Sequence, residues 1–204
     1  MKVFLFPLNN ALTLPKVAIP LHIFEPRYRE MIQDATTREV PVAVVQVRPD
    51  NDYRGVVFAA GVPQVMHRHE DGRLDISIIG EFRGRTQDRL GVSPYISYSA
   101  TEDQSNAQVT QKSAFARECL KDSLMNWAAS QMANDAQIEA LNELLQDPEA
   151  LASYSSMLFV QRPFLRQQLL EEGSVEKRLL ALYKEILPEK ILLGPFLAPL
   201  LTET

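Results

Sequence analysis

The sequence predicts an α+β protein in which a strand-rich region is followed by a bundle of helices. Two observations lead to this fold class. Apolar runs of strand length, separated by turn residues, fill residues 1–100. After a polar stretch over residues 101–111, apolar residues recur at the three- and four-residue spacing of helices. We therefore expect a β-rich domain over residues 1–105 and a helical domain over residues 106–204.

The composition indicates an ordinary globular protein and narrows the range of partners. Hydrophobic residues make up 46% of the 204 residues, and the net charge is -5 with a pI near 5.3. This acidic balance argues against general binding to nucleic acids or to anionic membranes. No segment approaches the ~20 apolar residues that span a bilayer. The single cysteine, Cys119, fits a reducing compartment, so the cytoplasm is the expected location.

Apolar runs and turn residues define the strands. The run Val3–Leu8 is apolar without alternation, as expected for a strand covered on both faces. Asp71 and Gly72 supply a tight turn that predicts a hairpin, and Pro63 marks its first strand as an edge or bulged strand. The other expected strands, with those of the hairpin, are Val40–Val47, Val56–Phe58, Val62–His67, Leu74–Ile79 and Pro94–Ser99.

Prolines and capping residues define the helices. Pro26 suits a first helical position and predicts one helix over residues 26–35 of the β-rich domain. In the helical domain, Asp147 precedes a proline as an N-cap precedes the first turn. Pro163 opens a further helix, and Pro188 closes the last one. The helices expected there begin near residues 114, 138, 148, 163 and 175.

Two motifs near the amino terminus resemble those of a known family. Phe6-Pro7-Leu8 is followed by Pro20-Leu21-His22-Ile23-Phe24-Glu25-Pro26-Arg27-Tyr28. This pattern resembles the signature of the amino-terminal, substrate-recognition domain of the Lon proteases, both in its spacing and in the polar residues Glu25 and Arg27. Further similar segments extend the resemblance over residues 3–187, namely Gly61–Val65, Asp71–Leu74, Gly80–Arg83, Tyr95–Ala100, Asp147–Ala152, Gln168–Glu171 and Arg178–Leu179.

The resemblance implies a PUA-like, β-barrel-like sheet domain joined to a helical bundle. It also implies a non-catalytic module that binds unfolded or extended polypeptides or a partner protein, compatible with an adaptor role in protein quality control. The sequence stops at Thr204 without the ATP-binding loop or the serine-lysine protease domain of a full Lon protease, so we expect no enzymatic activity and no cofactor. The alternatives are an RNA-contacting PUA-like module and a small-molecule enzyme with an unrecognised pocket.

The first set of candidate binding residues lies within the signature. Phe24, Glu25, Arg27 and Tyr28 stand just before and within the first expected helix. The carboxylate of Glu25 favours the positive end of the helix dipole, and Arg29 is four residues away from it. We expect Glu25 to cap this helix, with Arg29 as an available partner for its charge. A direct contact of the cluster with a partner is the alternative.

A second set of candidates is basic. Arg83 and Arg85, with Arg68, Arg73 and Arg89 nearby, form the one locally basic region of the sequence. Guanidinium groups are suited to bidentate contacts with carboxylates or phosphates. The simpler interpretation is a solvated strand face whose charge is balanced by acidic neighbours, namely Asp75, Glu81 and Asp88.

The sequence indicates neither a catalytic residue nor a metal site. Gly91-Val92-Ser93 starts like a nucleophile elbow, but Tyr95 stands where a second glycine is needed. His67 and His69 alternate along a strand as two metal ligands would, yet no third ligand has a diagnostic spacing. Cys119 lies among apolar residues of a helix and is expected to be a buried core thiol.

The carboxy-terminal tail over residues 189–204 is apolar and interrupted by prolines. Its large side chains would each gain ~1.5–3 kcal/mol on burial. We expect Leu192, Leu193, Phe196 and Leu197 to pack on the same domain or on a second copy of the chain, in which case the protein would self-associate through this tail.

Overall fold

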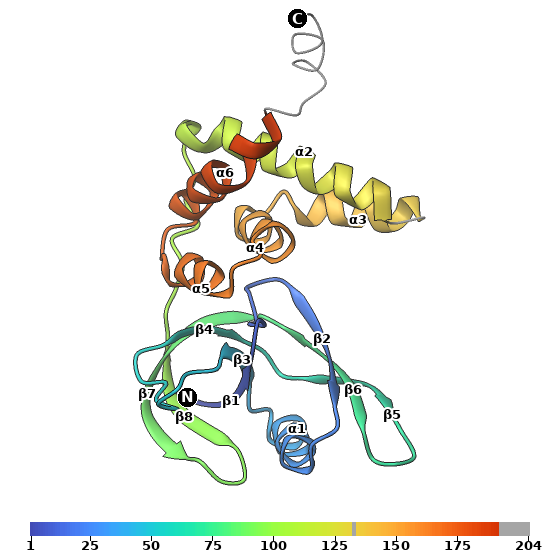
Figure 1. Cartoon of the computed structure of the whole chain (residues 1–204), viewed down its shortest axis with the longest axis vertical. Coiled ribbons are helices and arrows are strands. Elements are labelled where there is room, and N and C mark those ends of the chain that lie inside the picture. Colours follow the sequence, from blue (N-terminus) through green and yellow to red (C-terminus); the bar gives the residue numbers. More distant parts are fainter. Residues whose placement is uncertain (132–133, 192–204) are drawn as a thin grey trace, which may run out of the picture. The chain divides into compact units, whose positions relative to one another are not determined.

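Residues 1–131 and 134–191 are described by the computed structural model of the chain, which divides into two units (Figure 1). The first unit comprises Met1–Asn106 and Arg162–Gly173, and the second comprises Ala107–Gln161 and the described residues from Ser174 onward. The chain therefore leaves the first unit, returns to it for one helix and leaves it again. Within the described ranges, no helix is both long enough and apolar enough to cross a bilayer.

The strands of the first unit form two sheets. One has the order β3-β1-β8-β7-β4 and the other has the order β2-β6-β5. β1 is parallel to β3 and antiparallel to β8, and a bridge between Val42 and Gly61 links β3 to the end of β4, so the larger sheet curls into a nearly closed barrel. The strands are β1 Lys2–Leu8, β2 Ala18–Ile23, β3 Val42–Gln46, β4 Val57–Ala60, β5 Gln64–Arg68, β6 Leu74–Ile79, β7 Phe82–Gly91 and β8 Ile96–Glu102.

The continuous apolar run of β1 is explained by burial on both faces, as predicted. Phe4 and Phe6 belong to one core cluster, while Val3 and Leu5 belong to the other. Successive side chains of a strand point to opposite faces, so a strand between two cores needs apolar residues at every position. β1 is thus the partition between the two halves of the barrel core.

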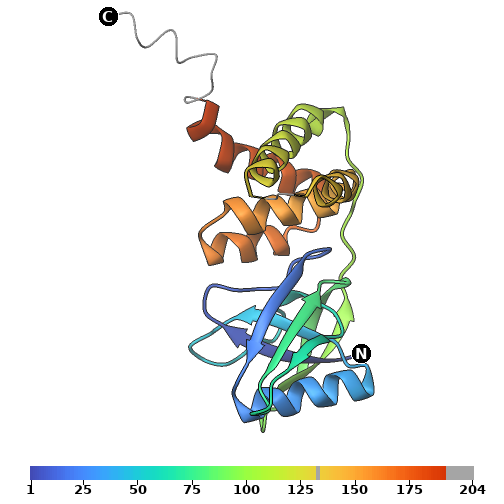
Figure 2. The same ribbon diagram turned by 90° about the vertical axis from the view of Figure 1, so that its right-hand side faces the viewer.

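The helix α1 (Pro26–Arg38) begins at the expected proline and continues three residues beyond the expected end. It runs along the barrel below the strands in Figure 2. Its apolar stripe completes the core cluster that contains Phe4 and Phe6. The buried residues of this stripe are Tyr28, Met31, Ile32 and Ala35.

The predicted hairpin of β5 and β6 is confirmed. Gly72 has a φ of 84°, a left-handed conformation that glycine adopts without strain, and the turn closes with a hydrogen bond from the Gly72 N–H to the His69 carbonyl. β5 is an edge strand with a bulge between Val65 and His67. This agrees with the expectation raised by Pro63, which cannot donate to a neighbouring strand.

Two strands were not expected from the sequence. β2 is largely apolar, but Pro20 in its middle argues against a strand, and most of its residues are exposed or half-buried. β7 carries four charged residues, and its buried positions are Arg83, Gly84 and Thr86. Strand signals depend on apolar periodicity, and a strand whose buried positions are polar or lack a side chain does not show it.

The second unit is helical. Its elements are η1 Gln111–Ser113, α2 Ala114–Gln131, α3 Asp135–Leu144, α4 Pro148–Phe159 and α6 Val175–Ile191, and α2, α4 and α6 pack against one another. Asp147 caps α4 as predicted, accepting a hydrogen bond of 2.9 Å from the backbone N–H of Glu149. The predicted end of the last helix at Pro188 is wrong, because α6 continues to Ile191. Proline removes one helical hydrogen bond, which kinks a helix without always ending it.

Candidate functional site

The helix α5 (Pro163–Glu171) belongs to the barrel unit and is held there by polar contacts. The side chain of Gln167 donates to the carbonyl of Val57 at 2.9 Å. Arg83 donates from Nε to the carbonyl of Leu170 and from Nη2 to that of Glu171, each at 2.9 Å. A cation at the carboxyl end of a helix satisfies free carbonyls and opposes the negative end of the dipole. These contacts fix α5 as a wall beside the barrel.

A cleft of about 600 Å³ lies between α5 and the segment that connects β3 to β4. This volume is within the range of ligand-binding clefts and is enough for several side chains. The residues that line it come from the end of β3 and the following loop and from α5: Gln46, Val47, Arg48, Pro49, Tyr53, Val56, Pro163, Phe164, Gln167, Gln168 and Glu171.

Tyr53 forms a rigid part of the cleft wall. Its side chain is fully buried, its hydroxyl accepts a hydrogen bond from the backbone N–H of Arg48 at 3.3 Å, and its own N–H donates to the hydroxyl of Tyr98 at 3.1 Å. Burial raises the pKa of the Tyr53 phenol above its ordinary value. The phenol therefore stays neutral across physiological pH, and it holds the 48–53 loop in place rather than acting as an acid or base.

The cleft exposes apolar side chains beside amide groups. Phe164 is 73% exposed and Val47 is 46% exposed, although both are large and apolar. Gln46 is the last residue of β3 and Val47 follows it, so both lie beside the cleft. Exposed apolar groups beside side-chain amides are suited to a peptide, because the apolar groups accept side chains and amides hydrogen-bond to backbone groups.

The signature residues lie elsewhere in the barrel unit and do not line this cleft. Glu25 is the N-cap residue of α1, but its side chain makes no capping hydrogen bond, and it pairs with Arg27 at 2.8 Å instead of with Arg29. The guanidinium of Arg27 stands 4.5 Å from the centre of the Tyr28 ring. Tyr28 is buried, whereas Phe24 is 63% exposed. Glu25 thus occupies the expected capping position. The expected capping hydrogen bond is absent, because the carboxylate pairs with Arg27, two residues along the chain.

The basic region is resolved into arginines with different environments. Arg83 is only 6% exposed and is directed at α5, so the expectation of a solvated strand face is wrong for this residue. Arg85 is exposed and pairs with Asp103 at 3.0 Å, and Asp103 also lies 3.6 Å from Arg83. The acidic partner is therefore Asp103 on the loop after β8, not one of the expected residues on the neighbouring strands.

The remaining candidates are the cysteine and the carboxy-terminal tail. Cys119 is half-buried rather than part of the core, and burial, aided by the nearby carboxylates of Asp122 and Glu118, raises the pKa of its thiol. A raised thiol pKa disfavours the nucleophilic thiolate. The tail residues, namely Leu192, Leu193, Phe196 and Leu197, lie outside the described residues.

Replacing Arg83 by methionine is expected to lower the free energy of unfolding by about 2–4 kcal/mol, because buried carbonyls of α5 lose their donors. Hydrogen exchange should show the amides of α5 losing protection before those of β1. Arg85→Met is the matched control on the same strand, and it should cost less than about 1 kcal/mol because the pair with Asp103 is exposed. Equal effects of the two substitutions would contradict the anchoring role of Arg83.

Comparisons with solved structures place this fold. The N-terminal domain of a Lon protease from the Mycobacterium avium complex matches with a TM-score of 0.70 and 21% identity, over 90% of this chain and 97% of that chain. A Lon N-terminal domain protein from Xanthomonas campestris matches with a TM-score of 0.66 and 18% identity, over 89% of this chain and 96% of that chain. Likenesses at these identities show the shared fold, including the predicted combination of barrel and bundle.

The family of the chain is shown by a match between its sequence and a protein-family model. The comparison with curated proteins gave no match. The model of the substrate-binding domain of ATP-dependent protease La (LON) matches residues 2–187, which include both units and the cleft. A match over this much of the sequence decides the assignment: the chain belongs to the LON substrate-binding domain family.

Proposed function

We propose that this chain is a non-catalytic module that binds polypeptides, and that the cleft beside α5 holds an extended, partly apolar segment of the bound chain. The observation that carries the proposal is the exposure of Phe164 and Val47 within a cleft of about 600 Å³. The family description supports a substrate-recognition role. Single exposed apolar residues are common on protein surfaces, but large apolar groups gathered in one cleft indicate a binding surface.

The chemistry of the cleft favours a peptide over a small charged ligand. Its wall includes the exposed ring of Phe164. Its polar side chains are three amides and one pair of opposite charges, namely Gln46, Gln167, Gln168, Arg48 and Glu171. Amides pair with the backbone N–H and C=O groups of any sequence, and apolar rings accept varied side chains. Such a surface gives broad selectivity and modest affinity, which suits recognition of unfolded chains.

A protein with this function would act as an adaptor between a bound polypeptide and other proteins. A module that holds an extended segment without cutting it passes the segment to other machinery, so we infer a role in protein quality control. We also infer the cytoplasm as its location, which is compatible with the single cysteine.

Phe164→Ser is expected to weaken binding of a fluorescently labelled, permanently unfolded protein about tenfold, measured by anisotropy. Reduced and carboxymethylated lactalbumin is a suitable probe. A tenfold loss of affinity corresponds to roughly 1.4 kcal/mol of binding free energy, supplied by the apolar burial that the complex loses. Because the side chain is 73% exposed, the substitution should leave the free energy of unfolding within about 0.5 kcal/mol.

The matched control is Phe24→Ser, which removes another exposed phenylalanine of the same unit. It should leave the affinity unchanged, since Phe24 does not line the cleft. Loss of binding with Phe24→Ser but not with Phe164→Ser would assign recognition to the signature segment instead. A wild-type chain that fails to bind the unfolded probe would overturn the proposed function itself.

A further inference from the structure

All three histidines of the chain gather on one face of the smaller sheet. His22 on β2 is the cross-strand partner of Asp75 on β6, and His67 on β5 is the partner of Asp75 on the other side. His69 follows β5, and its ring centre lies 5.4 Å from that of His22 and 4.6 Å from that of His67. Residues far apart in the sequence therefore converge on a single carboxylate.

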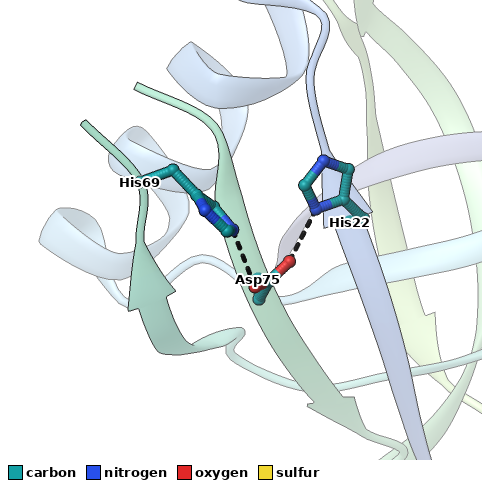
Figure 3. Close-up of side chains that lie close together, drawn as sticks. All are labelled: His22, His69 and Asp75. Carbon is teal, nitrogen blue, oxygen red and sulfur yellow. Dashed lines mark hydrogen bonds and ion pairs between the residues drawn. The ribbon is translucent and has the colours of Figure 1, made fainter. Parts of the chain in front are cut away.

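Two of these imidazoles bind the two oxygens of Asp75, as Figure 3 shows. Nδ1 of His22 lies 2.6 Å from Oδ1, and Nε2 of His69 lies 2.8 Å from Oδ2. Each ring thus already points one nitrogen toward the carboxylate.

The donor set matches the coordination chemistry of late first-row transition ions. One ligand atom from each of His22, His69 and Asp75 lies within 4.8 Å of the others. Ligand atoms around a tetrahedral Zn²⁺ ion, at about 2.0–2.2 Å from the metal, are separated by about 3.4 Å. The ligand atoms must therefore approach one another by up to about 1.4 Å, from 4.8 Å to about 3.4 Å, when an ion binds. Imidazole with carboxylate is a ligand set that suits Zn²⁺, whereas Mg²⁺ and Ca²⁺ prefer oxygen ligands alone.

We propose that His22, His69 and Asp75 form a binding site for Zn²⁺ or a similar divalent transition ion. The side chains are 31–43% exposed, so an ion has access and water can fill the remaining coordination position. Binding would connect β2, β6 and the end of β5, because the ligands come from these three segments. This site goes beyond polypeptide binding and does not depend on it.

The neighbouring cation limits the affinity without blocking the site. Nη1 of Arg73 lies 3.5 Å from Nε2 of His22, which is not the nitrogen that faces Asp75. The charge of Arg73 is countered by Asp71, whose carboxylate lies 2.6 Å from Nε of the same arginine. The ion must also displace two hydrogen bonds of Asp75. We therefore expect a site of moderate strength that other chelators can empty.

The test is isothermal titration of the untagged full chain with ZnCl₂ and CoCl₂. The expected result is one ion per chain and a Co²⁺ absorption spectrum typical of four or five ligands. His22→Ala, His69→Ala and Asp75→Asn should each weaken Zn²⁺ binding at least tenfold. Far-ultraviolet circular dichroism should show that the metal-free variants remain folded, since the replaced side chains are partly exposed.

His67→Ala is the matched control, because it removes an imidazole of the same cluster that does not contact Asp75 in the described hydrogen bonds. It should keep Zn²⁺ affinity within threefold of the wild type. Binding that survives Asp75→Asn, or that is lost with His67→Ala but kept with His22→Ala, would overturn this ligand set. Absence of heat and of Co²⁺ absorption at a several-fold excess of metal would overturn the site. In that case the cluster would be a hydrogen-bonded brace of the sheet.

Discussion

Replacing Glu149 by alanine should destabilise the helical unit by about 3–5 kcal/mol, which is the usual cost of leaving one partner of a buried ion pair alone. Glu149 in the first turn of α4 binds Arg178 of α6 through two hydrogen bonds of 2.6 and 2.9 Å. The side chain of Arg178 is 3% exposed and that of Glu149 is 11% exposed. Total stabilities are typically 5–15 kcal/mol, so this loss is a large fraction of the whole.

The chain offers its own reporter for this change. Trp127 is the single tryptophan and lies in α2, in the same unit as the ion pair. Its fluorescence during urea unfolding should show the midpoint shift with Glu149→Ala. Glu118→Ala, which removes an exposed acid of α2, should stay within about 0.5 kcal/mol. A loss below 1 kcal/mol with Glu149→Ala would show that the pair is not an important contact between α4 and α6.

A double substitution separates the ion pair from simple packing. If Glu149 and Arg178 are both replaced by methionine, no charge remains buried without a partner. The double variant should then be more stable than the sum of the two single losses indicates. Additive losses would instead assign the effect to each side chain alone.

The sequence reveals those parts of the fold whose signals are local. The run of β1 predicts burial on two faces, and the structure divides its side chains between two core clusters. Asp147 and the proline after it mark the start of α4, while Asp71 and Gly72 mark a hairpin turn. In each case the residues that cause the structure are neighbours in the chain, so a short window contains the full argument.

The cleft and its wall depend on contacts between distant residues. Arg83 and the carbonyl it binds in α5 are 87 positions apart, and no periodicity in β7 indicates that its arginine is buried. The two sides of the cleft come from the β3–β4 connection and from α5. The usable signal in α5 was Phe164, an apolar residue beside the helix stripe that carries the buried Leu169 and Leu170. Only the fold shows which surface such a residue joins.

The buried face of α2 is not marked by the largest apolar residues. In α2 the buried positions are Ala116, Leu120, Leu124 and Ala128, a narrow stripe at four-residue spacing. Phe115, a large apolar residue next to this stripe, is 63% exposed. Small residues bury as readily as large ones where helices pack closely, so residue size alone misplaces the stripe. The same limit applies to Cys119.

Gly80→Ala should destabilise the barrel unit by about 3 kcal/mol or more. The added methyl group would clash with backbone atoms, which cannot shift as easily as a flexible side chain can. A Cβ at Gly80 would stand 2.2 Å from the carbonyl oxygen of Leu14 and 3.1 Å from Cα of Pro15. The segment cannot simply move away. The N–H of Lys16 donates to the Gly80 carbonyl at 2.7 Å, and the N–H of Gly80 donates to the carbonyl of Val17 at 3.2 Å.

The same change should also weaken polypeptide binding, because the displaced segment supports the cleft. The carbonyl of Ala11 accepts a hydrogen bond from the side chain of Gln46, and the carbonyl of Asn10 accepts one from Arg166 of α5. Gly173→Ala is the matched control, since its Cβ would meet only the end of the Arg83 side chain, at 3.8 Å. Circular dichroism during urea unfolding and anisotropy with the unfolded probe measure the two effects. If Gly80→Ala were as stable and as active as Gly173→Ala, the 10–17 segment would not be a fixed support of the site.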